Sequence, residues 1–402
     1  METRIVGTVS PYADPLHVAM TVEQLWQSVP GGSGTYVRAL AAALEARDDV
    51  VMTGIAARGA HAGEHGLPAS LDLGVSVLPR RFLYQSWSRL RRPGVPRSAR
   101  MRRDGRRFDV VHATTWAVPP RTAPLVVAVH DVAFLRNPEH FTPHGVAFFQ
   151  RALEATRRDA DIVIVPSEAT RSDCLDAGID AERIRLVSHG TEAQRTEPAD
   201  VAAFRARHGL HRDFVLWCGT LEPRKNVSSL LAAFRELASG DPGLDLVLVG
   251  PHGWGETSAE VRAAATALPT DRLHVLGKLS QEDLQLAYAG ARVFCFPSLW
   301  EGFGMPVLEA MVHGTPVVTS RGTSMAEIAQ GGALLVDPLD PTAIAAAITE
   351  AAGPSHAVLS AGGRANAATF TWERSAEQHV AAYRDAVELS STGAARRSGT
   401  SR

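Results

Sequence analysis

The chain has 402 residues, of which 45% are hydrophobic and 21% are charged, and its formal net charge is −2. This length exceeds one ordinary hydrophobic core and predicts two globular domains. The near-neutral charge argues against nucleic acid as the main partner. No apolar run reaches the roughly 18 residues that a membrane-spanning helix needs, and we recognise no signal peptide. Three cysteines without metal or disulfide spacing, at 174, 218 and 295, indicate a reducing cytoplasm.

Predicted strands and helices alternate along the first half of the chain. We expect strands at 5–9, 50–56, 75–78, 110–113, 125–130, 162–166 and 184–188, and helices at 35–46, 143–158 and 169–177. This alternation predicts a parallel sheet covered by helices. The polar segment 192–200 is expected to be a linker.

A second alternating series follows the linker. We expect strands at 214–218, 244–249, 273–276, 293–296, 317–319 and 333–336, and a helix at 341–352. The sequence therefore predicts an α/β protein with two sheets. Because ligands of open α/β sheets bind beyond the strand C-termini, the loops that leave the strands are the places to search for a site.

The most informative loop, at 297–304, follows the buried strand 293–296 and precedes a helix that begins near Met305. A glycine-rich loop before a helix N-terminus presents free backbone N–H groups and suits a phosphate. Glu301 lies at the loop mouth and Glu309 about one turn inside the helix, where both could accept hydrogen bonds from sugar hydroxyls. That layout fits a nucleotide sugar. The alternative is an ordinary β-loop-α unit with two solvated acids.

The same segment resembles the Glu-x7-Glu signature of the retaining GT-B glycosyltransferases of the family four type. The matching positions include Gly302, Gly304, Pro306, Ala310, Gly314 and Pro316. The resemblance implies a GT-B fold, with two Rossmann-like domains facing across a cleft. It places an acceptor-side domain at 1–193, a nucleotide-sugar-binding domain at 200–371 and a helix at 372–389 that packs back on the first domain. The small, polar, basic tail at 390–402 is expected to be disordered.

A second loop carries two adjacent cations, Arg224 and Lys225, between a strand and a helix. The planar guanidinium group of arginine can donate two parallel hydrogen bonds, and the ammonium group of lysine is a compact positive charge. Together they suit a diphosphate. The stretch that begins at Gly219 resembles the family's Gly-Thr-Leu-Glu-Pro-Arg-Lys-Asn motif, which implies that both cations bind the donor diphosphate. Many relatives place an arginine directly after the glycine, where this chain has Thr220. Two solvated cations at a helix start are the alternative.

The glycine-rich segment at 31–34 is predicted to be a loop before a helix, where its glycines allow close approach to an anion. It does not match a dinucleotide fingerprint, because the spacing differs and the predicted strand 5–9 ends some twenty residues earlier. It resembles the glycine loop of these transferases that faces the donor phosphates and the acceptor.

His130 and Asp131 end a predicted strand, and a lone histidine in such a place is more often structural than catalytic. The pair is similar to the family's His-Asp motif, which implies that His130 contacts the transferred sugar near its C6 hydroxyl. Asp131 would fix the loop or meet the acceptor. The nearby Phe134 and Pro138 favour relatives of the mannosyltransferase type.

The resemblance gives each candidate a role. The catalytic candidates are His130, Glu301, Arg224 and Lys225. The donor-binding candidates are Gly32, Ser33, Gly34, Gly219, Gly302, Phe303, Gly304, Met305, Val307, Leu308, Glu309 and Lys278. The acceptor-side candidates are Tyr36, His112 and Asp131. Within these sets, Glu301 would hold the 3- and 4-hydroxyls of the sugar and Glu309 the ribose hydroxyls.

We expect no metal and no cofactor besides the donor substrate. Asp159 and Asp161 superficially match an Asp-x-Asp metal motif, but they introduce a predicted strand and are interpreted as structural. The two cations of the second loop and the helix dipole would then stabilise the leaving diphosphate.

Segment 80–107 is strongly basic, with eleven arginines against one acid, Asp104. Aromatic and leucine side chains interrupt the arginines at 82, 83, 84, 87 and 90. Such a stretch could lie on an anionic membrane, at its inner face, or meet an anionic acceptor. The alternative is a solvated arginine-rich surface.

Together these observations predict a retaining glycosyltransferase that moves a hexose, with mannose favoured, from GDP-mannose or a UDP-sugar to an acceptor hydroxyl. The acceptor could be a glycan, a lipid-linked sugar or a small metabolite. The alternatives are a nucleotide-sugar epimerase or sugar-phosphate synthase on the same fold, and an inactive GT-B binding module. The intact set Glu301, Glu309, Arg224 and Lys225 argues against an inactive module.

Overall fold

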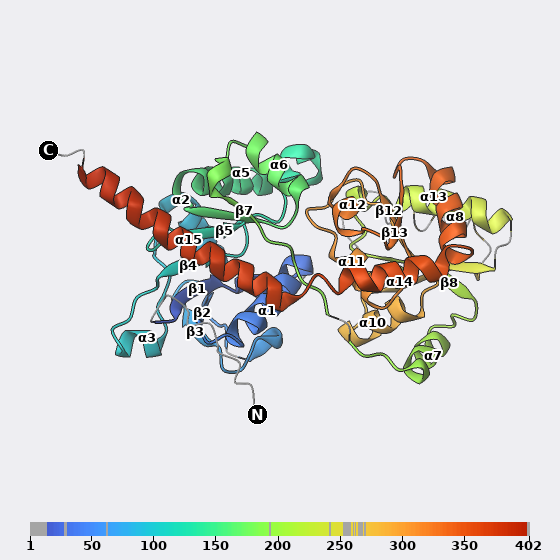
Figure 1. Ribbon diagram of the computed structural model, residues 1–402, viewed down its shortest axis with the longest axis horizontal. Helices are drawn as coiled ribbons and strands as arrows, with labels where there is room; N and C mark the ends of the chain where they lie inside the picture. The colour runs from blue at the N-terminus through green and yellow to red at the C-terminus, as the bar shows by residue number, and fades with distance from the viewer. Residues whose placement is uncertain are drawn as a thin grey trace, which may run out of the picture. The chain divides into compact units, whose positions relative to one another are not determined.

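The computed structural model describes residues 14–27, 30–61, 63–192, 194–240, 243–251 and 271–399, together with residues 259, 261, 263 and 268 (Figure 1). The chain divides into two compact units. The first unit comprises Met1–Val129, Phe148–Ile164 and Ala376–Arg402, and the second comprises His130–Ala147 and Val165–Ser375.

The first sheet has seven strands in the order β3-β2-β1-β4-β5-β6-β7. Its strands are β1 Leu16–Thr21, β2 Val50–Ala56, β3 Asp72–Val75, β4 Val110–Ala113, β5 Leu125–Ala128, β6 Ile162–Val165 and β7 Ile184–Leu186. The pairings from β3 through β6 are parallel. Every residue of β4, β5 and β6 is buried, as expected for strands whose sheet is covered on both faces.

The second sheet has six parallel strands in the order β10-β9-β8-β11-β12-β13. Its strands are β8 Asp213–Cys218, β9 Leu244–Val249, β10 Leu273–Gly277, β11 Val293–Phe296, β12 Val317–Ser320 and β13 Ala333–Val336. The strand order reverses between β8 and β11. The loops that leave these two strands therefore meet at a topological switch point, where open α/β sheets bind ligands.

Helices connect the strands of both sheets. They are α1 Gly31–Glu45, α2 Arg80–Leu90, α3 Ala99–Arg103, α4 Ala133–Arg136, α5 Pro143–Asp159, α6 Glu168–Asp176, α7 Pro198–Arg207, α8 Val227–Ser239, α10 Gln281–Gly290, α11 Met305–Val312, α12 Ser324–Ile328, α13 Pro341–Ala352, α14 His356–Ala367 and α15 Trp372–Gly399. Within the described residues, none of the helices is both long enough and apolar enough to cross a membrane.

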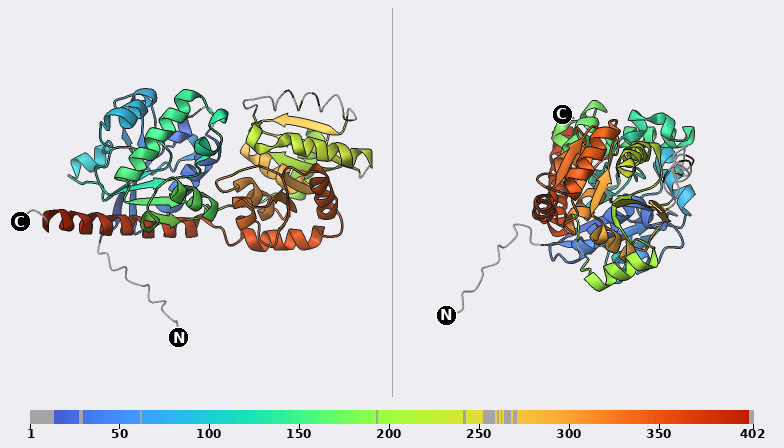
Figure 2. Two further views of the ribbon diagram at one scale, coloured as in Figure 1. Left: turned by 90° about the horizontal axis from the view of Figure 1, so that it is seen from above. Right: turned by 90° about the vertical axis from the view of Figure 1, so that its right-hand side faces the viewer.

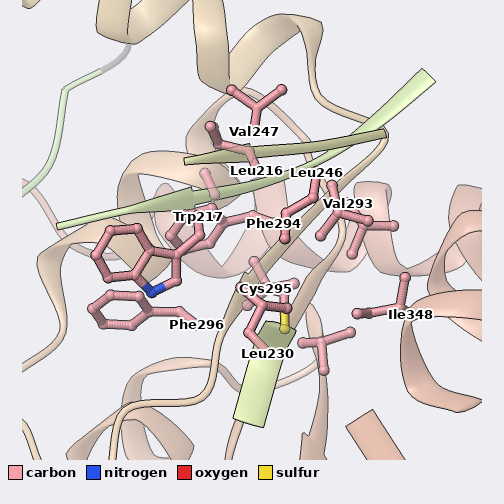
Figure 3. Close-up of a cluster of buried hydrophobic side chains, with 14 of the residues drawn as sticks. Leu216, Trp217, Leu230, Leu246, Val247, Val293, Phe294, Cys295, Phe296 and Ile348 are labelled. Atoms are coloured by element: carbon pink, nitrogen blue, oxygen red, sulfur yellow. The ribbon is translucent and has the colours of Figure 1, made fainter. Parts of the chain in front are cut away.

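The core of the second unit forms around β8 and β11 (Figure 3). Trp217 and Phe296 lie against each other there, and both are fully buried. Leu230 from α8 and Ile348 from α13 close the core on the helix side. Burying one such side chain contributes about 1.5–3 kcal/mol, so this core holds the ends of β8 and β11 in a defined position.

The helix α15 is anchored to the first unit by polar side chains. Tyr383 Oη lies 2.9 Å from His112 Nδ1, and Tyr36 Oη lies 2.8 Å from His379 Nε2. These four side chains are buried. Arg384 adds an ion pair of 2.8 Å with Asp49. Hydrogen bonds that are shielded from water in this way fix the position of the helix on β4 and α1.

Several element boundaries differ from the sequence prediction. The strand β1 at Leu16–Thr21 was not predicted, because Ala19 and Met20 have weak strand propensity and its burial depends on the neighbouring strands β2 and β4. The predicted strand 5–9 lies outside the described residues. The strand predicted at 75–78 is found at Asp72–Val75, and β5 ends at Ala128 rather than at 130.

Two further predictions are wrong. The segment 31–34 is the first turn of α1 and not a loop, although glycine is a poor helix former. A Cβ at Gly34 would overlap Pro30, so close packing at the start of α1 requires glycine there. The tail predicted to be disordered from residue 390 continues α15 to Gly399, because extending an existing helix costs little.

Candidate functional site

A buried cluster of charges connects the loops that follow β8 and β11. Glu301 Oε1 accepts a hydrogen bond of 2.6 Å from Lys225 Nζ, and its Oε2 lies 2.7 Å from Arg224 Nη1. The Glu301 side chain is 10% exposed. The structure thus unites the first glutamate of the signature with both predicted diphosphate ligands.

The electrostatics of this cluster follow from burial and charge pairing. Burial alone would raise the pKa of Glu301, but the charges of Arg224 and Lys225 outweigh it and lower that pKa to about 2. Burial, with repulsion from Arg224, lowers the pKa of Lys225, while Glu301 opposes this shift. Burial disfavours the charged Arg224, yet Glu301 and Glu222 raise its pKa. Glu301 is therefore ionised at neutral pH.

Arg224 is held in place from two further sides. Its Nη2 lies 2.8 Å from Glu222 Oε1, and its Nη1 donates to the Trp300 carbonyl oxygen at 2.9 Å. The Glu222 side chain is only 6% exposed. Sequence reasoning missed Glu222, although its place two residues before Arg224 in the same loop is a local signal for an ion pair.

The loop after β11 is fixed by close packing and by hydrogen bonds. A Cβ at Gly302 would overlap the carbonyl oxygen of His130, so only glycine fits there. Gly304 precedes α11 with φ 103°, a conformation that glycine adopts readily. Ser324 Oγ donates to the Glu301 carbonyl oxygen at 2.7 Å, and Ser167 Oγ donates to that of Gly302 at 2.6 Å. These contacts therefore fix the backbone at the predicted phosphate position.

The second glutamate lies inside α11, as predicted from the sequence. Glu309 Oε2 accepts a hydrogen bond of 2.8 Å from Tyr288 Oη on α10. Tyr288 is fully buried, and burial together with the nearby Cys218 and Glu309 raises its pKa well above the usual range. Tyr288 therefore stays a hydrogen-bond donor and orients Glu309. Nothing local predicts this contact, since the two residues are 21 apart in sequence.

Asn226 joins the loop after β8 to the ends of two other strands. Its Nδ2 donates to the carbonyl oxygens of Pro297, at 3.0 Å, and Pro338, at 2.6 Å. Its φ of 53° is in the left-handed region, which asparagine tolerates better than most residues. Asn226 thus keeps the cations beside Glu301, a role that its place in the sequence does not predict.

The His-Asp pair follows β5. Asp131 Oδ1 accepts a hydrogen bond of 3.0 Å from the Ala133 N–H, which supports its predicted role in fixing this loop. The ring of His130 lies 5.4 Å from that of His189, edge to face. The electrostatic influence of Asp131 reaches Arg224 and contributes to its raised pKa. A contact between His130 and a sugar stays a prediction.

In the described part of the chain, the other predicted residues form no hydrogen bond or ion pair with this cluster. Gly32, Ser33 and Gly34 belong to α1 in the first unit. Tyr36 and His112 are 1% and 0% exposed and join the anchor of α15, so their geometry does not support an acceptor-side role. The side chains of Phe303, Val307 and Leu308 are buried in the core, which leaves only their backbone for a ligand. Lys278 is exposed just after β10.

Both aspartates of the Asp-x-Asp motif are paired with arginines. Asp159 lies 2.8 Å from both Arg91 and Arg158, and Asp161 forms an ion pair of 2.7 Å with Arg121. Asp161 also accepts a hydrogen bond from the Leu125 N–H. In the described part of the chain, no group of three or more His, Cys, Asp or Glu side chains could hold a metal ion.

Comparisons with known proteins agree with this geometry. The family described as Glycosyl transferases group 1 matches residues 201–352, and the one described as Glycosyltransferase Family 4 matches residues 30–195. O-antigen chain mannosyltransferase B of Escherichia coli is 31% identical over 283 residues, which cover 68% of this chain and 74% of that protein. The chain belongs to the family 4 glycosyltransferases. It is therefore an enzyme, a hexosyltransferase that uses a nucleotide sugar.

A second curated relative of this glycosyltransferase is a D-inositol 3-phosphate glycosyltransferase of Geodermatophilus obscurus. It is 31% identical over 306 residues, which cover 70% of this chain and 67% of that protein. Anabaena HepE, solved in complex with UDP and glucose, has a TM-score of 0.69 at 21% identity and covers 91% of this chain and 98% of its own. This likeness shows the fold, and the predicted GT-B class is confirmed.

Proposed function

We propose that the glycosyltransferase moves a hexose, with mannose favoured, from a nucleoside diphosphate sugar to an acceptor hydroxyl with retention at the anomeric carbon. The buried cluster of Glu301, Arg224 and Lys225 carries this proposal. It places two cations beside a carboxylate at the switch point of the second sheet. The name of the Escherichia coli relative supports mannose, and the UDP in the Anabaena structure supports a UDP-sugar as the alternative donor.

The donor would bind by exchanging partners within the cluster. A diphosphate brings more negative charge than one carboxylate, so it competes with Glu301 for Arg224 and Lys225. Glu301 then loses its cationic partners and gains the capacity to accept hydrogen bonds from the sugar 3- and 4-hydroxyls. The same exchange places the phosphates next to the N-terminus of α11, whose dipole favours an anion.

Bond cleavage would then leave a diphosphate anion held by the two cations. Positioned charges of this kind stabilise the developing negative charge in the transition state. The departing phosphate oxygen, on the same face of the sugar as the acceptor, would take the acceptor proton. No carboxylate serves as a covalent nucleophile in this scheme, which is consistent with the ion pairing of Glu301.

Glu309 would bind the ribose hydroxyls in the orientation that Tyr288 gives it. This division of roles predicts different binding defects for the two glutamates. Glu309→Gln should weaken both the free nucleoside diphosphate and the donor, because charge-assisted hydrogen bonds worth about 1.5–3 kcal/mol are lost. Glu301→Gln should bind the nucleoside diphosphate nearly normally and lose most of its turnover.

Calorimetry with GDP, GDP-mannose, UDP and UDP-glucose on both variants tests this scheme and identifies the donor. Glu236→Gln, which alters an exposed glutamate on α8, is the control and should behave like the wild type. If Glu301→Gln weakens the bare diphosphate as much as the sugar-bearing donor, the assigned geometry is wrong. An inverted anomeric configuration in the product, measured by NMR, would contradict retention.

A further inference from the structure

Four aromatic rings from separate parts of the second unit pack on one another, with His189 at their centre. The centroid of the His189 ring lies 5.4 Å from that of His130 and 4.8 Å from that of Phe303, in both cases edge to face. The same ring stacks on Trp372, with 6.1 Å between centroids and 19° between planes. These distances are those at which aromatic rings attract each other. We call these four rings the aromatic cluster.

The backbone beside His189 is held against the start of α15. A Cβ at Gly190 would lie 2.4 Å from the backbone nitrogen of Trp372, so only glycine fits there. The Thr191 N–H donates to the carbonyl oxygen of Phe370 at 2.9 Å. Phe370 belongs to the short segment that connects α14 to α15, the red end of the chain (Figure 2). His189 therefore has a fixed place in the aromatic cluster.

The backbone of His130 lies beside the loop that carries Glu301. A Cβ at Gly302, the residue after Glu301, would lie 1.8 Å from the carbonyl oxygen of His130. Thr170 Oγ1 lies 3.0 Å from the carbonyl oxygen of Gly302 and 3.3 Å from that of His130. These contacts fix the main chain of His130. The orientation of its imidazole depends on the rings that pack against it, because side-chain bonds rotate between several staggered positions.

We propose that His189 is a positioning residue, which holds the imidazole of His130 in the orientation that meets the transferred sugar. The inference rests on the proposed function, in which the sugar lies beside Glu301. The edge-to-face contact restricts rotation of the His130 ring, and Phe303 and Trp372 fix His189 in turn. His189 is only 6% exposed, so it acts through His130 and not by touching the sugar itself.

The competing interpretation is that His189 only fills space in the core. Space filling needs a side chain of suitable volume, whereas positioning needs a ring that faces His130. In the proposed scheme the diphosphate is bound by Arg224 and Lys225, so a change at His189 should alter turnover and leave nucleoside diphosphate affinity intact. A collapse of the core would alter both.

Donor hydrolysis, in which water replaces the acceptor, measures kcat with GDP-mannose or UDP-glucose. His189→Leu keeps an apolar side chain and removes the ring, so kcat should fall at least about tenfold, since small misplacements of a positioned group are costly. His189→Phe keeps a ring, so its kcat should stay within about threefold of the wild type. Calorimetry should give a nucleoside diphosphate affinity within about twofold of the wild type for both variants.

The matched control is His208→Leu. His208 is a half-buried histidine of the second unit whose ring packs on Phe204, with 4.7 Å between centroids. Its kcat and its nucleoside diphosphate affinity should equal those of the wild type. Thermal unfolding shows whether each variant is folded. If His189→Leu is not folded, His189→Met provides the same comparison, because its flexible side chain adapts to the space available.

A double-mutant cycle separates positioning from a structural role. In a His130→Ala background, His189→Leu should change kcat by less than about twofold, because the ring to be positioned is gone. A loss of the same size in both backgrounds would overturn the proposal. So would a wild-type kcat in folded His189→Leu, or a loss that His189→Phe fails to relieve.

A measurement without donor distinguishes failure of this inference from failure of the proposed function. In the histidine-labelled chain, the NMR signal of the His130 ring is assigned by its loss in His130→Ala. This signal should shift in His189→Leu, because a neighbouring aromatic ring is removed, and stay in place in His208→Leu. An unchanged His130 signal in His189→Leu would overturn the inference. A wild type that neither binds nor hydrolyses a sugar nucleotide would instead overturn the proposed function.

Discussion

Glu301 links the stability of the fold to pH. Its pKa in the folded chain is about 2, against an ordinary value of 4.5, so the folded state resists protonation more than the unfolded state does. The ionised carboxylate therefore stabilises the fold above pH 4.5, and this contribution is lost as the pH falls from 4.5 towards 2.

The variant Glu301→Gln should lose this dependence. Between pH 6 and pH 3, the free energy of unfolding of the wild type should fall by about 2 kcal/mol more than that of the variant. Denaturant titrations of the wild type and of the variant at each of these pH values measure the free energies of unfolding. Glu236→Gln, at an exposed site on α8, should fall as the wild type does. Parallel losses in wild type and Glu301→Gln would show that Glu301 is not held by its cations in solution.

The contribution of Tyr288 to nucleotide binding can be measured separately. Its hydroxyl orients Glu309 through one hydrogen bond of 2.8 Å, so Tyr288→Phe removes the orientation and keeps the ring. We expect nucleoside diphosphate affinity to fall roughly tenfold, the scale of one hydrogen bond to a charged group. Calorimetry with the cognate nucleoside diphosphate measures the loss.

The matched control for that experiment is Tyr383→Phe. It also removes a buried tyrosine hydroxyl, which is 2.9 Å from His112, but it lies in the first unit. Its nucleotide affinity should equal that of the wild type. If Tyr288→Phe binds the nucleotide normally, the proposed contact between Glu309 and the ribose loses its support.

At the scale of elements, buried polar side chains help to hold α15 on the first unit, in addition to its buried apolar residues. Tyr383→Phe should destabilise the chain by about 1–3 kcal/mol, because His112 Nδ1 loses a buried partner. Leu389→Ala on the same helix, at a side chain 42% exposed, should change stability by less than about 0.5 kcal/mol. Chemical denaturation measures both values, and equal effects would contradict this view of the anchor.

Elements with strong local patterns were predicted well. The strands β8, β9 and β11 and the helix α13 have the predicted bounds to within one residue, because continuous apolar runs bounded by turn residues mark buried strands. The strand β1 and the first turn of α1 were not predicted. Their conformations depend on neighbours that come later in the chain, and local propensity points elsewhere.

For the molecule as a whole, the charge arrangement predicts catalysis without a divalent cation. The described residues contain no cluster of metal ligands, and in the proposed scheme Arg224 and Lys225 would provide the positive charge that a leaving diphosphate requires. Turnover of the cognate donor should therefore persist in EDTA. Complete loss of activity that Mg²⁺ or Mn²⁺ restores would contradict this prediction.

The sequence by itself determined the α/β class and the family, since both depend on local information. Apolar runs mark the strands, and the signature around Glu301 and Glu309 occupies consecutive positions. It also located the two cations, because they follow a predicted strand directly.

Only the tertiary structure decided which of these groups touch. Arg224 and Glu301 are 77 positions apart, and Tyr36 and His379 are 343 apart, so no local periodicity encodes their contacts. Folding brought Glu301 between the cations and buried Tyr36 and His112 beneath α15, where a sequence reading had placed them facing an acceptor. The physical reason is that burial and charge pairing are set by packing between distant segments, whereas the sequence pattern reports only what each segment prefers alone.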